Sequence, residues 1–156
     1  MQRHGTIDQQ LADVELFRGL PTKKLRAITS LTTRVDLPPG AVLTREGRPG
    51  AQFVILLEGT AAVSTCDRVI AMRGPGDFLG EISLLGARVQ TATALTTTPV
   101  VAAVVSKPDF WSLLGEAPTV AESLRAAMTD RLSEIRTQVP DASWVASPPA
   151  RSTPLV

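Results

Sequence analysis

The chain has 156 residues, of which 44% are hydrophobic and 20% are charged, so it has room for one domain with a real core and for a tail. Its 16 Lys and Arg nearly balance its 15 Asp and Glu, and the net charge of +1 argues against a nucleic-acid or anionic-membrane surface. Cys66 is the only cysteine and His4 the only histidine, which excludes an intrachain disulfide and argues against a metal site.

The sequence carries no signal for export or for a membrane. Residues 1–10 are polar and lack the apolar stretch of a signal peptide. The longest apolar run, Val100–Val105, is far shorter than the roughly 20 residues of a membrane-spanning helix. We therefore expect a cytoplasmic protein without a membrane partner.

The N-terminal part has the spacing of short helices. Apolar residues recur there at the helical period, namely Ile7, Leu11, Val14, Leu25, Ile28 and Leu31. Gly19–Pro21 divides the pattern into two helices, with Pro21 in the first turn of the second. We take residues 1–15 as a helical segment that precedes the main domain.

After Thr32 the pattern changes to short strands. Segments rich in Val, Leu, Ile and Thr alternate with turns that contain glycine and proline. The predicted strands are Thr33–Leu37, Ala41–Arg45, Gln52–Glu58, Ala61–Thr65, Val69–Arg73, Thr91–Thr97 and Val100–Ser106. Such short strands with close turns predict a mainly β fold, an antiparallel β-barrel or jelly roll with flanking helices.

One segment inside the β region has helical character. Glu81–Leu85 reads Glu-Ile-Ser-Leu-Leu, which is too apolar for an exposed loop, and it lies between Gly80 and Gly86. We expect a single helical turn set between two strands.

The helical period returns after the last strand. Pro108–Leu114 predicts a short helix, and Pro118 opens a longer amphipathic helix that ends before Pro140. The apolar stripe of the longer helix consists of Val120, Leu124, Met128, Leu132, Ile135 and Val139. Residues 140–156 are rich in proline, alanine and serine and are expected to form a disordered tail, which leaves 16–139 as the domain.

Three stretches of the β region occur in a recognisable order. They are Leu37–Gly40 with the following Glu46-Gly47, then Phe53–Gly59, then Gly76–Leu85, which reads Gly-Asp-Phe-Leu-Gly-Glu-Ile-Ser-Leu-Leu. Together they resemble the cyclic-nucleotide-binding domain family, which includes the sensor domain of the catabolite activator protein and the regulatory subunits of cAMP-dependent protein kinase. The third stretch is similar to the phosphate-binding cassette of that family. The resemblance implies a jelly roll that binds cAMP or cGMP.

The cassette contains the first candidate binding residues, Gly80, Glu81 and Ile82. A helix that starts there presents unpaired backbone N–H groups, which suit a phosphate, and Gly80 lets a ligand approach the backbone. The resemblance implies that Glu81 accepts a hydrogen bond from the ribose 2′-hydroxyl. The alternative is that Glu81 only complements the start of the helix. In both cases we expect a surface carboxylate that contributes little to stability.

The sequence departs from the family at the phosphate. The resemblance calls for an arginine nine residues after Glu81, and that position is Gln90. A charge-assisted hydrogen bond contributes about 1.5–3 kcal/mol and a neutral one about 0.5–1.5, so binding would weaken roughly ten-fold or more. Arg88 is either a substitute cation or a solvated loop charge. Thr91 either offers its hydroxyl to the ligand or is an ordinary strand residue.

We therefore expect a regulatory module that binds a cyclic nucleotide, moves its C-terminal helix and acts on a separate effector protein. The apolar stripe of that helix either packs on the β domain or also forms a homodimer. Residues 141–156 are too few and too rich in proline for a helix-turn-helix, so no DNA-binding domain is expected.

Two other classes of function compete with this hypothesis. A degenerate domain can keep the fold as a dimerisation or protein-interaction scaffold without a ligand, and Gln90 favours that alternative. An enzyme is not expected, because a single terminal histidine provides neither a metal cluster nor a catalytic dyad. We predict no catalytic residue, no metal ligand and no cofactor.

Overall fold

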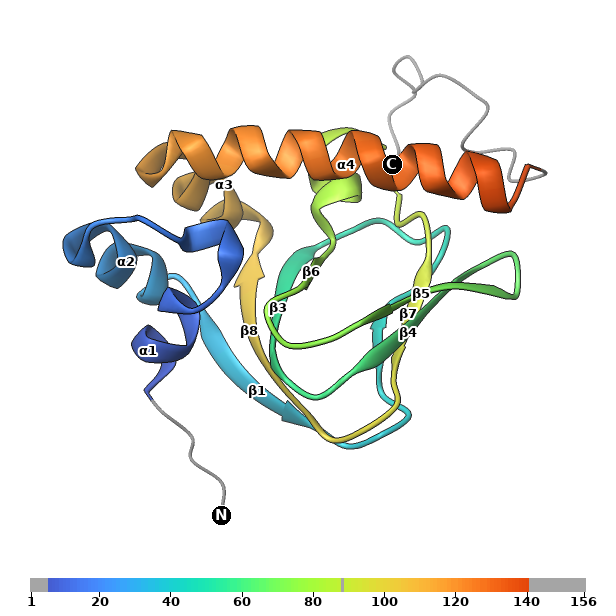
Figure 1. Ribbon diagram of the computed structural model, residues 1–156, viewed down its shortest axis with the longest axis horizontal. Helices are drawn as coiled ribbons and strands as arrows, with labels where there is room; N and C mark the ends of the chain where they lie inside the picture. Colours follow the sequence, from blue (N-terminus) through green and yellow to red (C-terminus); the bar gives the residue numbers. More distant parts are fainter. Residues whose placement is uncertain (1–5, 88, 141–156) are drawn as a thin grey trace.

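The computed structural model describes residues 6–87 and 89–140, which form a β domain flanked by helices (Figure 1). Short helices come first, strands interrupted by one helical turn follow, and two helices close the described chain. This is the predicted order of elements.

Three short helical segments precede the first strand. They are α1 (Ile7–Ala12), the 3₁₀ turn η1 (Glu15–Phe17) and α2 (Thr22–Thr29). A capping box begins α1: the Gln9 N–H donates to Thr6 Oγ1 over 3.2 Å, and the Thr6 N–H donates to Gln9 Oε1 over 3.1 Å. Pro21 lies just before α2 and not in its first turn, so that detail of the prediction was wrong.

The described strands form two antiparallel sheets, in the orders β1-β8-β3-β6 and β2-β7-β4-β5. Their bounds are β1 Thr33–Leu37, β2 Val42–Thr44, β3 Gln52–Glu58, β4 Ala61–Thr65, β5 Arg68–Arg73, β6 Phe78–Leu79, β7 Thr93–Thr96 and β8 Val100–Ser106. The predicted jelly roll is confirmed, as two sheets and without a closed barrel in the described chain. Only β6 was not predicted, because two residues are too few to show an alternating pattern.

The central strand β3 is buried on both faces, which explains its unbroken apolar sequence. Val54 and Leu56 face the second sheet. Phe53 and Ile55 face the helices, and the ring of Phe53 lies 5.0 Å from the ring of Phe110 in α3. Each of these side chains contributes about 1.5–3 kcal/mol through its burial, so β3 holds the sheets and the helices together.

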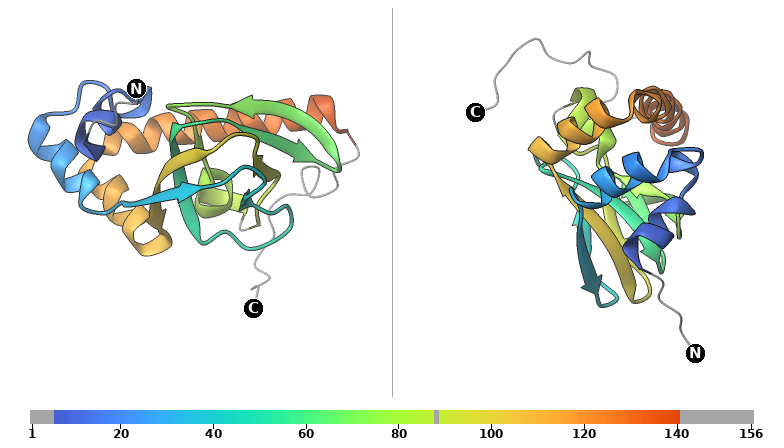
Figure 2. Two further views of the ribbon diagram at one scale, coloured as in Figure 1. Left: turned by 90° about the horizontal axis from the view of Figure 1, so that it is seen from below. Right: turned by 90° about the vertical axis from the view of Figure 1, so that its left-hand side faces the viewer.

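Two helices, α3 (Lys107–Glu116) and α4 (Pro118–Gln138), follow β8. Figure 1 shows α4 along the top of the molecule, over the helical turn that follows β6, and Figure 2 shows the two sheets extending below α4. The stripe predicted for this helix is buried at Val120, Leu124, Ile135 and the adjoining Val139, and partly buried at Met128 and Leu132. The C-terminal end of α4 is fixed to β5, because the amide of Gln138 donates to the carbonyl oxygen of Ile70 over 3.4 Å.

Some predictions fall outside this part of the chain. Arg88 and residues 141–156 are not among the described residues. The domain limits at residues 15 and 139 stay predictions. None of the helices in the described ranges is long and apolar enough to cross a membrane.

Candidate functional site

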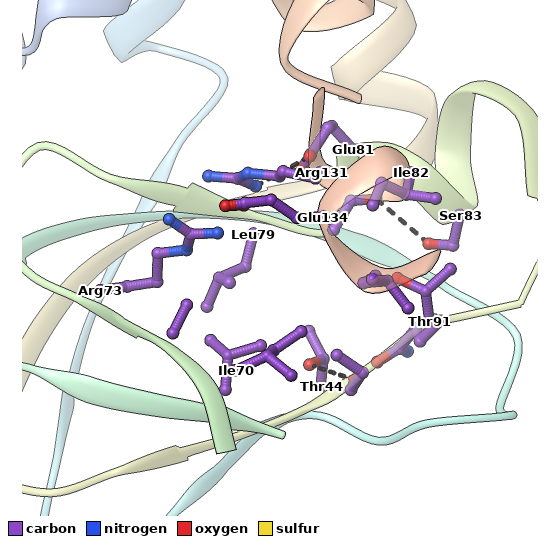
Figure 3. A pocket seen from close by; sticks show the side chains of 16 residues that line it. Thr44, Ile70, Arg73, Leu79, Glu81, Ile82, Ser83, Thr91, Arg131 and Glu134 are labelled. Atoms are coloured by element: carbon purple, nitrogen blue, oxygen red, sulfur yellow. Dashed lines mark hydrogen bonds and ion pairs between the residues drawn. The ribbon is translucent and has the colours of Figure 1, made fainter. Parts of the chain in front are cut away.

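A pocket lies between the second sheet, the segment that follows β6, and α4 (Figure 3). The space within it, counted out to its open mouth, is about 560 Å³. The predicted residues Gly80, Glu81, Ile82, Gln90 and Thr91 all line it. The fold thus brings the two separate parts of the predicted site into one place.

The predicted helical turn begins at Glu81 and continues as a π-helical segment, Ser83–Ala87. Gly80 precedes it with a φ of +99°, and a Cβ there would lie 2.4 Å from the carbonyl oxygen of Gln52 in β3. The turn packs so closely on β3 that only glycine fits. This adds a structural requirement to the ligand access that we expected of Gly80.

The carboxylate of Glu81 is buried, with 1% of the residue exposed. Its Oε2 accepts a hydrogen bond from Nη1 of Arg131 over 2.8 Å, whereas Oε1 is buried without a hydrogen-bond partner among the described residues. Burial raises the pKa of Glu81, and the nearby Arg131 guanidinium opposes that effect. The expectation of a surface carboxylate was therefore wrong: Glu81 places a buried acceptor at the wall of the pocket.

Arg131 comes from α4, and the sequence analysis missed it. Its Nη1 also donates to the carbonyl oxygen of Phe78 over 2.9 Å, and its guanidinium lies 4.4 Å from the centre of the Phe78 ring. The sequence does contain a signal for Arg131, because it lies seven residues after Leu124 and four before Ile135, on the buried face of α4. A charge in an apolar stripe indicates a buried partner.

The side chain of Gln90 is engaged by the protein. Its Oε1 accepts from the backbone N–H of Arg45 over 2.6 Å, and its Nε2 donates to the carbonyl oxygen of Pro49 over 3.2 Å. Its backbone forms two further bonds of 2.8 Å, with Gly47 and Arg48. Gln90 thus ties the loop after β2 to the edge of the pocket, and these bonds leave its amide one N–H for a neutral hydrogen bond to a ligand.

The remaining predicted residues have different positions. Thr91 is buried, and its carbonyl oxygen accepts from the hydroxyl of Thr65 over 3.1 Å. Ile82 is buried as well and contributes apolar surface to the pocket. Because Arg88 lies outside the described residues, both of its interpretations stay open.

Two further charged residues line the pocket and were missed, Arg73 at the end of β5 and Glu134 on α4. Nε of Arg73 is buried and has no hydrogen-bond partner within the described chain. Burial, and then the nearby Arg131, lowers the pKa of Arg73. The alternation of side chains along a strand could have placed Arg73 on the pocket side of β5. Arg73 pairs with Ala61 in the sheet, and the buried Ala61 lies on the inner face.

Comparison with known proteins places this geometry in a family. Residues 34–117, more than half of the chain, match the family described as "Cyclic nucleotide-binding domain". The CRP-like cAMP-activated global transcriptional regulator of Mycobacterium tuberculosis is 26% identical over 140 residues, which cover 86% of this chain and 62% of the regulator. The chain thus spans less than two thirds of that relative.

Solved structures share the fold. The cAMP-bound PfPKA-R superimposes with a TM-score of 0.80 at 20% identity, over 88% of this chain and 48% of that one. The regulatory subunit of a cAMP-independent protein kinase A from Trypanosoma cruzi, bound to guanosine, gives 0.76 at 23% identity, over 91% and 51%. The jelly roll, the cassette sequence and the match over residues 34–117 agree, and the chain belongs to the cyclic nucleotide-binding domain family.

Proposed function

We propose that the chain is a regulatory module whose pocket binds a purine ribonucleotide, with cAMP and cGMP as the first candidates. The observation that carries the proposal is Oε1 of Glu81, a buried acceptor without a partner among the described residues. Such an unsatisfied group costs about 1–3 kcal/mol, and a ribose hydroxyl is a donor that would satisfy it. The relative named as cAMP-activated and the cAMP-bound neighbour support this choice.

The position of α4 gives the module a way to respond. Arg131, Glu134 and Ile135 of this helix line the pocket, so a bound ligand contacts α4 as well as the cassette. A ligand shifts the equilibrium between two positions of a helix by the difference in its affinity for them. In this proposal α4 carries the signal to a separate effector protein, and the module itself does no chemistry.

A second ligand class, a nucleoside without phosphate, is favoured by Gln90. Both polar atoms of its amide are bound to the loop after β2, so the position that carries arginine elsewhere in the family brings no charge and at most one further neutral N–H. The neighbour from Trypanosoma cruzi holds guanosine in the same fold. A nucleoside would keep the contact of its ribose with Glu81 and would not require a phosphate partner.

Isothermal titration calorimetry with cAMP, cGMP, adenosine and guanosine tests the proposal. Saturable heat at micromolar ligand is expected for the parent chain. Glu81→Gln should weaken binding about ten-fold, because a neutral hydrogen bond replaces a charge-assisted one. The control, Glu122→Gln, changes an exposed carboxylate on α4 and should leave the affinity unchanged.

Two results would redirect the proposal. Silence from all four ligands at millimolar concentration would support the scaffold without ligand. Gln90→Arg separates the two ligand classes, because a charge-assisted phosphate contact should tighten cyclic nucleotides about ten-fold and leave nucleosides unchanged.

A further inference from the structure

The outer face of the second sheet gathers exposed apolar side chains. Five large hydrophobic residues are exposed in the described ranges, and four of them, each 41% to 61% exposed, lie on strands of this sheet: Val42, Val69, Met72 and Leu95. The fifth, Trp111, lies in α3. None of the five is on α4, so the exposed apolar surface of the described chain favours this sheet as a contact surface over the C-terminal helix.

This outer face is also uncharged. Side chains alternate between the two faces of a strand, and the outer set over β2, β7, β4 and β5, whose residues are all described, consists of Val42, Thr93, Leu95, Ala62, Ser64, Val69 and Met72. The charged residues of β5, Arg68 and Arg73, pair with the buried Thr65 and Ala61 and belong to the inner face. A sheet face in water is ordinarily polar, whereas an apolar patch without charges indicates an interaction surface.

Four of these side chains form one row across the sheet. Leu95 pairs with Val42 on one side and with Ala62 on the other, and Ala62 pairs with Met72. The row therefore reads Val42, Leu95, Ala62, Met72 and spans about 14 Å. Turned end for end, it places Leu95 over Ala62 and Met72 over Val42. A large side chain then meets a small one at the centre, so the row is complementary to itself.

We propose that this row is the contact between two copies of the chain, in a homodimer whose twofold axis runs parallel to the strands. Sheets that pack face to face lie about 10 Å apart with their strands within about 30° of each other, which this axis allows. Leu95 of each copy then contacts Ala62 of the other, as a twofold interface requires. A second copy fits better than an unrelated protein, because it supplies the complementary row and brings no charge to the face.

The size of the face determines the strength of the contact. Four strands are about 19 Å across, and five residues along a strand span about 17 Å, so the flat footprint is roughly 320 Å² on each copy. A contact of this size stays below the roughly 1,200 Å² that stable complexes bury. We therefore expect a reversible dimer with a dissociation constant on the order of 100 µM.

The pocket stays open in this dimer. Thr44 and Ile70 line the pocket from the inner face of the same sheet (Figure 3). Two copies joined through their outer faces would hold their pockets on opposite sides of the dimer. The inference therefore does not depend on the identity of the ligand.

Sedimentation velocity of the full chain, from about 10 µM to about 1 mM, tests the inference. The average mass of the parent should rise from that of one chain toward that of two. Leu95→Glu should weaken the dimer at least about ten-fold, because it buries an unpaired charge. The matched control Trp111→Glu places the same charge on α3 and should leave the dissociation constant unchanged. If Leu95→Glu lowers the melting temperature, Met72→Lys on the edge strand β5 serves in its place.

A mixing experiment tests the symmetry. The twofold axis brings the two copies of position 95 close together, so an equimolar mixture of Leu95→Glu and Leu95→Lys should dimerise more tightly than either variant alone. A mixture that associates no more tightly than its components overturns the proposed arrangement.

Two further results would overturn the inference. One is a parent that remains monomeric up to about 1 mM. The other is a dimer that survives Leu95→Glu and Met72→Lys but is lost in Ala126→Arg, which changes an exposed residue of α4 and would assign the contact to that helix. Neither result bears on the proposed function, which is tested separately by calorimetry with the four ligands.

Discussion

Replacement of Arg131 by methionine is expected to destabilise the fold more than any other single charge removal on α4. The substitution leaves Glu81, of which 1% is exposed, without the cation 2.8 Å away, and it also removes the bond to the Phe78 carbonyl. Removal of one partner of a buried pair costs about 3–5 kcal/mol. Protonation of Glu81, whose pKa burial already raises, limits that cost. We expect a loss of about 3 kcal/mol at neutral pH, or about 6–12 °C in Tm.

Urea and thermal unfolding of four variants measure this effect. Arg131→Met keeps a long, unbranched side chain that favours helix, so propensity changes little. Arg125→Met is the matched control, because Arg125 is exposed on the same helix, and it should stay within about 0.5 kcal/mol of the parent. Glu81→Gln and the double variant complete a cycle. The double variant should lose at least about 1 kcal/mol less than the sum of the single losses.

The reasoning fails under either of two results. Equal losses for Arg131→Met and Arg125→Met would show that the ion pair contributes nothing measurable. Strict additivity in the cycle would show that Glu81 and Arg131 do not interact energetically, whatever their separation.

Three further predictions concern stability. Because the pKa of Glu81 is raised in the folded chain, the folded state keeps this proton to higher pH than the unfolded state does. Stability is therefore lost as the pH rises from the ordinary pKa of a glutamate to the raised pKa of the folded state, and urea midpoints across that range should fall less for Glu81→Gln than for the parent. Gly80→Ala should unfold at markedly lower temperature, since its Cβ would meet Gln52 at 2.4 Å, whereas Gly115→Ala, with open space around it in α3, should be neutral or stabilising by up to about 1 kcal/mol in calorimetry. Phe110→Ala should cost about 3–5 kcal/mol in urea unfolding. The adjacent Trp111→Ala should cost much less, because Phe110 is 0% and Trp111 45% exposed. Equal costs would contradict the burial of Phe110 against β3.

The strands were predictable because each pattern is local. β1, β3, β4 and β8 have the predicted bounds, and glycine and proline mark the turns between them. The cassette was found for a similar reason, as a helical run in a β context. These features could be predicted because they depend only on residues that are close together in the sequence.

The environment of Glu81 could not be predicted in this way. Its burial depends on α4, whose Arg131 is 50 positions further along the chain. The engagement of Gln90 likewise depends on the loop after β2, 41 to 45 positions away. Local pattern indicates which residues gather at a site, whereas the partners of each polar atom are fixed by tertiary packing.

The contact between Glu81 and Arg131 also bears on how firmly α4 is held against the cassette when no ligand is bound. A separation of α4 from the cassette would break the bonds of Arg131 to Glu81 and to the Phe78 carbonyl together, and it would expose the buried apolar stripe of α4, so partial fraying of this stretch is disfavoured. A free-energy cost of about 3 kcal/mol for separating α4 from the cassette would leave α4 released in roughly one molecule in a hundred at equilibrium. In the proposed module, the background signal without ligand would depend on this ion pair together with the buried apolar stripe of α4.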